Sequence, residues 1–191
     1  MRKTYVLIVF AMLFAVTAMA QDTPISPGSM MVGGSAYFQS LSGDLYENEA
    51  GDSYTEIMVA PNFGYFVAPG LVIGGELAFS SMKQGDYDAS AIGIGPMIGF
   101  YFNVNSARTE VKGSIYPYIK GQFIFLSASF NDSDATQLSL GGGAGINYMI
   151  SDAVAIDLGL QIFSDSYEPD GGDSISGMNM MFGAGIQAFV F

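Results

Sequence analysis

The stretch YTEIMVAPNFGYF, from Tyr54 to Phe66, decides the fold because its side chains alternate between two kinds. In an extended chain, successive side chains point to opposite faces, so one face here is large and apolar and the other is small or polar. The first face consists of Ile57, Val59, Phe63 and Tyr65, and the second of Glu56, Met58, Ala60, Asn62 and Gly64. A period of two predicts a β-strand.

The same alternation continues outward from this stretch to both sides. The segments that show it are Met30–Leu41, Tyr54–Phe66, Leu71–Ser80, Ala89–Asn103, Ile119–Phe125, Gln137–Tyr148, Val154–Ile162 and Asn179–Val190. The turn residues between them are typical of antiparallel neighbours. The sequence therefore predicts an all-β fold, an antiparallel up-and-down β-barrel of about eight strands.

The second face decides between a soluble and a transmembrane barrel. A lipocalin-like barrel, with an apolar interior, would turn this face to water and should carry many Lys and Glu residues there. The face is instead mostly Gly, Ala, Ser, Asn and Gln, which is typical of a crowded polar lumen. A transmembrane barrel with an apolar exterior is therefore predicted, and a lipocalin-like binder is the less favoured alternative.

The N-terminal residues predict export. Arg2 and Lys3 precede an apolar run that is too short for a membrane-spanning helix, and small residues close the run at Ala20. We therefore expect a cleavable signal peptide over residues 1–20. A short N-terminal periplasmic segment over 21–28 and the barrel over 29–191 are expected to follow.

The connections between the predicted strands indicate an orientation. Tight turns are expected at Ala68–Gly70 and Ser151–Asp152, and long connections at Ser42–Asp52, Met82–Asp88, Asn131–Ala135 and Asp165–Ser174. Because outer-membrane barrels have short periplasmic turns and longer extracellular loops, both termini should face the periplasm. The connection at Val104–Gly113 departs from this pattern, since it is long where a short turn is expected.

The long loops are acidic, in a chain with eighteen acidic and six basic residues and a net charge of −12. This charge makes nucleic acid an improbable partner. The loop carboxylates that could contact a cation or another ligand are Asp44, Glu47, Glu49, Asp52, Asp165, Glu168, Asp170 and Asp173. A divalent cation site is conceivable here, but no complete Ca²⁺-loop spacing occurs, so a solvated charged surface is the preferred interpretation and no metal is predicted.

Four charged residues are expected inside the barrel. Glu56, Glu76, Lys120 and Asp157 share the inward register, which predicts a lumenal polar network, because buried charges persist when they are paired. Glu56 and Glu76 could in principle form a catalytic carboxylate pair, although the structural network is preferred. The chain has neither His nor Cys, which removes the usual triad base, the thiol nucleophile and the common metal ligands. No enzyme activity and no cofactor are predicted.

Three segments carry a resemblance to a known family. MMVGGSAYFQS at Met30–Ser40, APNFGYFVAPGLVIGGELAFSS at Ala60–Ser81 and GAGIQAFVF at Gly183–Phe191 resemble the small OmpA-type and OmpX-type outer-membrane barrels, in particular porin-family barrels common in Bacteroidetes. The resemblance implies a Gram-negative outer-membrane location, with lipid and lipopolysaccharide as neighbours. It also implies insertion by machinery that reads a C-terminal aromatic such as Phe191. The alternation turns Phe189 and Phe191 inward, unless a bulge near Gln187 shifts them.

These features favour a membrane-embedded scaffold that presents acidic extracellular loops to an unknown surface ligand. A narrow porin-like channel or passive transporter is the main alternative. A barrel of eight strands is just wide enough for its own side chains to fill, which argues against an open pore. The many inward glycines leave more room than usual, so a narrow channel remains an alternative.

Overall fold

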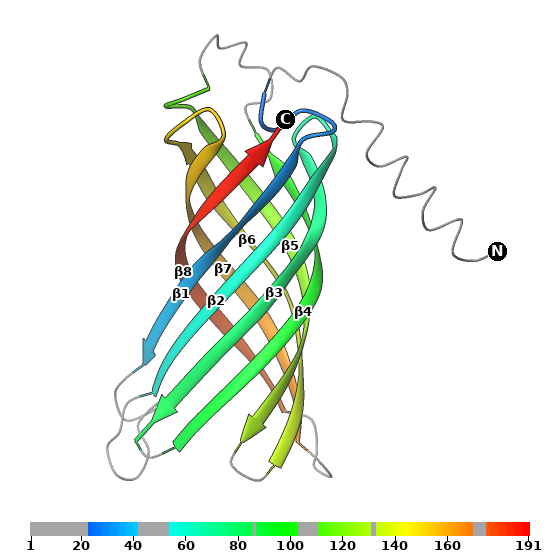
Figure 1. Cartoon of the computed structure of the whole chain (residues 1–191). Coiled ribbons are helices and arrows are strands. Elements are labelled where there is room, and N and C mark those ends of the chain that lie inside the picture. The colour runs from blue at the N-terminus through cyan, green and yellow to red at the C-terminus, as the bar shows by residue number, and fades with distance from the viewer. Residues whose placement is uncertain (1–22, 42–53, 86, 103–110, 131–132, 170–174) are drawn as a thin grey trace, which may run out of the picture.

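The computed structural model (Figure 1) describes residues 23–41, 54–85, 87–102, 111–130, 133–169 and 175–191. Eight antiparallel strands follow one another around a closed barrel, and β8 pairs with β1 to close it. The prediction of an all-β, up-and-down barrel is confirmed. The strands are β1 (Met30–Leu41), β2 (Tyr54–Ala68), β3 (Leu71–Gln84), β4 (Tyr87–Tyr101), β5 (Ile115–Phe130), β6 (Ser133–Met149), β7 (Val154–Pro169) and β8 (Ile175–Val190).

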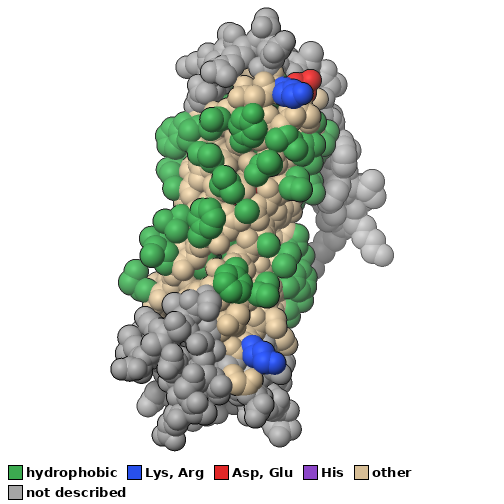
Figure 2. All heavy atoms as spheres, turned by 90° about the vertical axis from the view of Figure 1, so that its left-hand side faces the viewer, with side chains coloured by type: hydrophobic (Ala, Val, Ile, Leu, Met, Phe, Trp, Pro, Cys, Tyr) green, Lys and Arg blue, Asp and Glu red, His purple; other side chains and the backbone are tan. Residues whose placement is uncertain are grey.

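The two faces of the barrel wall differ as the alternation predicts. On the outer face Ile94 exposes 63% and Ile186 61% of its surface, whereas Glu76 on the inner face exposes 2%. Figure 2 shows apolar side chains over the middle of one side of the barrel, with charged side chains only near its two ends. A soluble barrel would hide these large apolar groups inside. The lipocalin-like alternative is therefore excluded by the direction in which they point.

Three connections differ from the expected lengths because the strands continue further than the alternation does. β3 and β4 are separated only by Gly85 and Asp86, and β5 and β6 only by residues 131–132. β7 likewise runs to Pro169, so Asp165 lies in a strand and not in a loop. Backbone pairing continues in these extensions, for example at Lys83↔Asp88. Beyond the apolar band both faces can be polar, so a strand there no longer shows the period of two.

The last strand keeps its register to the end. Gln187 pairs with Gly33 on one side and with Ala155 on the other, without a shift, so the paired residues of β8 contain no bulge there. Phe189 points inward as expected and exposes 3% of its surface. Phe191 follows the end of β8 and is 42% exposed, so it is not enclosed in the lumen as Phe189 is. A residue beyond the last ladder pair is not held to the alternation.

We call the end of the barrel where β1 begins and β8 ends the terminal end, and the opposite end the loop end. Residues 23–29 fold across the terminal end and add the fully buried Ile25 to its interior. The Gly28 N–H donates to the Phe66 carbonyl at 2.8 Å, and the Gly70 N–H to the Ile25 carbonyl at 2.9 Å. Gly70 has a φ of +75°, which glycine adopts without strain, in the tight β2–β3 turn.

The long connection between β4 and β5 also contributes to the terminal end. Val111 packs against the buried residues there, and the Gly113 N–H donates to the Met149 carbonyl at 2.8 Å. Part of this connection is therefore a cover and not a free loop.

The lumen is layered along the barrel axis. A terminal cluster of buried apolar and tyrosine side chains comprises Ile25, Met31, Phe66, Val72, Met97, Tyr101, Tyr116, Tyr118, Met149, Ala155 and Phe189. A loop-end cluster comprises Tyr37, Met58, Ala60, Ala78, Ile124, Leu126, Phe163 and Met181. Between them lies a polar layer of Ser35, Asn62, Glu76, Lys120, Gln122, Asp157, Gln161 and Gln187.

Candidate functional site

The polar layer is built around an ion pair that spans three strands. Lys120 Nζ on β5 lies 3.3 Å from Glu76 Oε2 on β3, and their side chains are 11% and 1% exposed. Their partners on the intervening strand β4 are both glycines, because Glu76 pairs with Gly95 and Lys120 with Gly99. The ion pair therefore crosses a strand that carries no side chain at either of these two positions.

Asp157 also forms a polar contact across a glycine of the intervening strand, on the other side of the barrel. The Ser35 hydroxyl on β1 donates to Asp157 Oδ2 on β7 at 2.8 Å. The intervening residue on β8 is Gly185, which pairs with both Ser35 and Asp157. Inward glycines therefore set which polar groups of this layer can meet, and the strands on either side supply the donor and the acceptor.

Tyrosine hydroxyl groups complete the polar contacts. Gln161 Nε2 donates to the Tyr37 hydroxyl group. Asn147 Nδ2 donates to the Tyr101 hydroxyl at 3.2 Å, and that hydroxyl donates to Met31 Sδ at 3.1 Å. The alternation predicts that Tyr101, Asn147 and Gln161 point into the lumen, but their hydrogen-bond partners lie on other strands. No local sequence signal identifies those partners.

The four charged residues predicted for the lumen lie at two levels. Lys120 and Asp157 line one small cavity, and Lys120 pairs with Glu76. Glu56 is not brought to this group, because it lines a separate cavity at the loop end. Glu56 and Glu76 are therefore not assembled as a carboxylate pair.

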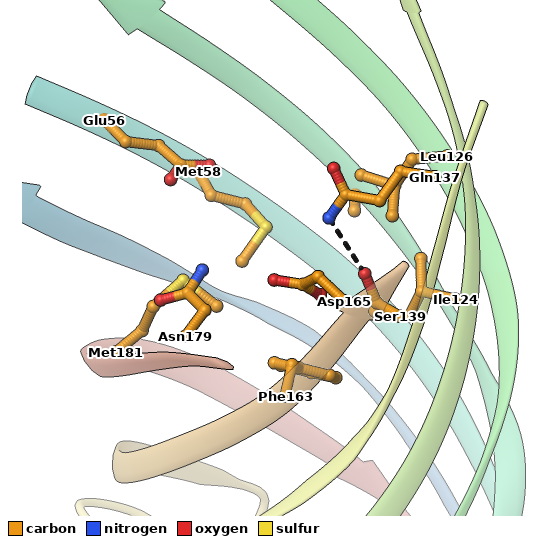
Figure 3. A pocket seen from close by; sticks show the side chains of 11 residues that line it. Glu56, Met58, Ile124, Leu126, Gln137, Ser139, Phe163, Asp165, Asn179 and Met181 are labelled. Carbon is orange, nitrogen blue, oxygen red and sulfur yellow. Dashed lines mark hydrogen bonds between the residues drawn. The ribbon is translucent and has the colours of Figure 1, made fainter. Parts of the chain in front are cut away.

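The cavity at the loop end is the acidic mouth of the lumen, with a volume of about 40 Å³. Figure 3 shows the Asp165 carboxylate directed into it, among apolar side chains of the loop-end cluster. Gln137 Nε2 donates to Ser139 Oγ at 3.1 Å on its wall. The lining residues carry two carboxylates and no base; they are Glu56, Met58, Ala78, Ile124, Leu126, Gln137, Ser139, Phe163, Asp165, Asn179 and Met181.

Most of the predicted loop carboxylates lie outside the described residues. These are Asp44, Glu47, Glu49, Asp52, Asp170 and Asp173; Glu168 belongs to β7, but its side chain is also outside the described part. Among the residues that the structure describes, no three acidic, His or Cys side chains are grouped to hold a metal ion. The described part also contains no helix long and apolar enough to cross a membrane.

A closed barrel of eight strands with an apolar exterior and a lumen filled by side chains defines a small transmembrane β-barrel. The chain belongs to the outer membrane protein beta-barrel domain family, which matches residues 6–187. Its location is accordingly the bacterial outer membrane.

The chain is similar to two solved structures. Neisserial surface protein A (NspA) is 17% identical, with 84% of this chain and 96% of that chain covered and a TM-score of 0.57. The outer membrane protein OprG from Pseudomonas aeruginosa is 12% identical, with 85% and 95% covered and a TM-score of 0.48. At 17% identity the likeness to NspA shows the fold alone. Comparison with curated proteins gives no significant match.

Proposed function

We propose that this protein is a non-enzymatic scaffold of the outer membrane, which holds a closed barrel in lipid and presents its acidic loop end at the cell surface. The observation that carries the proposal is the filled lumen. Two apolar clusters and a polar layer occupy it from one end to the other in the described residues. A barrel closed in this way can act through the surface it displays, but offers no passage through its interior.

The inward glycines support a closed lumen and not a wide one. A Cβ atom at Gly183 would overlap with the Tyr37 ring, and one at Gly145 or Gly159 would overlap with the Tyr118 hydroxyl. The room that glycine leaves is thus taken by a large side chain from another strand. The lumenal cavities of about 40 Å³ and 20 Å³ can each hold individual waters, since one water needs roughly 10–15 Å³.

The polarity of the two ends supports placing the loop end outside. The terminal end is closed by Ile25, Val111 and the terminal cluster, which present little for a partner to bind. The loop end has the acidic mouth and connects to the acidic segment from Asp44 to Asp52. On this proposal the partner is an extracellular ligand with positive charge, while the outer face contacts lipid and lipopolysaccharide after membrane insertion.

Cysteine labelling tests this display directly, because the chain has no cysteine of its own. Gly177→Cys at the loop end and Ala153→Cys at the terminal end are both solvent-exposed positions, so they form a matched pair. On intact cells a membrane-impermeant maleimide should label Gly177→Cys and not Ala153→Cys. After lysis it should label both variants. Labelling only at Ala153→Cys would overturn the proposed orientation.

A further inference from the structure

Beyond the scaffold role, we propose that the polar layer contains a binding site for one monovalent metal cation, coordinated by Asn62, Asp157 and Gln187. Na⁺ is the probe ion that we use to define it. The site is a cavity of about 20 Å³ inside the barrel, which has room for one occupant of about the size of a water molecule. Its other lining residues are Met31, Val72, Met97, Gly99, Tyr101, Tyr118 and Lys120.

Three oxygen atoms around this cavity have no hydrogen-bond partner although they are buried. They are Asn62 Oδ1, Asp157 Oδ1 and Gln187 Oε1, and their residues are 8%, 3% and 3% exposed. They come from β2, β7 and β8, so the closure of the barrel brings them together. Buried acceptors without partners are costly, and amide and carboxylate oxygens are ligands for hard cations.

The charge of the polar layer also calls for a cation. Glu76 and Lys120 neutralise each other, which leaves the Asp157 carboxylate as one net negative charge. The Asp157 carboxylate accepts hydrogen bonds from the hydroxyl groups of Ser35 and Tyr118, but a hydroxyl group brings no compensating charge. Lys120 is the only base that points into the lumen among the described residues. A buried charge without compensation is strongly unfavourable, and one monovalent cation removes it.

The alternatives to a monovalent cation satisfy the cavity less well. A water molecule has two hydrogens to donate, whereas three of the residues that line the cavity each carry a buried acceptor without a partner, and water leaves the net charge in place. A divalent ion would leave a net positive charge beside the Lys120 ammonium group. A proton on Asp157 would neutralise the charge; the ionisable groups that face Asp157 are Lys120, Tyr37, Tyr101 and Tyr118. The experiment distinguishes the proton from a metal cation, because it compares how the unfolding rate depends on pH and on the cation.

The test measures the urea unfolding rate of the whole refolded protein in a zwitterionic detergent, using the gel shift between folded and unfolded barrels. NaCl is compared with N-methylglucamine chloride at the same concentration, so that ionic strength is fixed and only the cation differs. Binding to the folded state stabilises it by a factor of 1 + [Na⁺]/Kd, so unfolding should be about threefold slower at twice the Kd. Equal rates in the two salts at every concentration would overturn the proposal.

Variants assign the effect to this cavity. Asp157→Asn should abolish the difference between the two salts. Asn62→Leu removes one neutral ligand and should reduce the difference, so it provides a second test if Asp157→Asn does not refold. Asp165→Asn removes a carboxylate from the acidic mouth and should keep the full difference, since the mouth is a separate cavity. A sodium effect that survives Asp157→Asn, or a rate that follows pH and not the cation, would contradict the site.

Discussion

The two ends of the barrel use the same strands to different effect. At the terminal end, residues 23–29 and Val111–Ser114 fold over the opening, and backbone hydrogen bonds fasten them to Phe66 and Met149. At the loop end, the strands extend past the apolar band and surround an acidic cavity. In the described residues, one end is therefore closed by packed chain, whereas the other is an opening surrounded by strand ends that carry carboxylates.

Removing a buried aromatic ring at the terminal end should have the largest effect. Phe66 is fully buried, lies 5.5 Å from Tyr101 between ring centroids, and receives the N-terminal segment. We expect Phe66→Ala to lower the free energy of unfolding by about 3–5 kcal/mol, because it leaves a cavity. Phe163→Ala, the matched change beside the open loop-end cavity, should cost less. Urea unfolding in detergent compares them, and equal losses would show that the two ends are packed alike.

Breaking the ion pair of the polar layer should have the next largest effect. Lys120→Met leaves Glu76 buried without its partner and should cost about 3 kcal/mol. The double variant Lys120→Met/Glu76→Gln should recover a large part of this loss, because the uncompensated charge is gone. The unfolding midpoint in detergent is the readout. A midpoint unchanged in the single variant would show that the pair does not stabilise the barrel.

The glycine positions sharpen the comparison at the level of single side chains. Gly183→Ala places a methyl group against the Tyr37 ring and should cost about 1–3 kcal/mol. Gly177→Ala lies on the same strand at the loop end, where nothing lies within 4 Å, so it is the control and should be nearly neutral. Similar losses in both variants would mean that strand propensity, and not lumenal crowding, sets the cost.

The smallest effect is expected at the acidic mouth. Asp165→Asn removes one carboxylate at the loop end, where the lining residues of the cavity include no base. The free energy of unfolding should therefore change by less than about 0.5 kcal/mol. Its effect should fall on binding, with weaker retention of a polycationic peptide by cells. A large loss of stability would make the mouth part of the fold and not a surface for a partner.

The fold was predictable from the sequence because the alternation reports directly on which side chains meet lipid. Glu76 and Asp157 could be placed inside the barrel by parity alone. Their partners could not, because Ser35 and Asp157 are 122 positions apart and meet only after the barrel closes. The strands extend beyond the predicted segments for a related reason. Outside the apolar band, as at Lys83↔Asp88, backbone pairing does not require an alternation of apolar and polar side chains.

The most direct test of the closed scaffold is the conductance of the protein, refolded and inserted into a planar bilayer, with a gel shift to confirm folding. The double variant Tyr37→Ala/Phe163→Ala, which removes two rings from the loop-end cluster, and Phe66→Ala at the terminal end serve as comparisons. We predict no discrete conductance steps for the unaltered protein. Discrete cation-selective steps from the folded, unaltered barrel would contradict the filled lumen and make the protein a narrow channel.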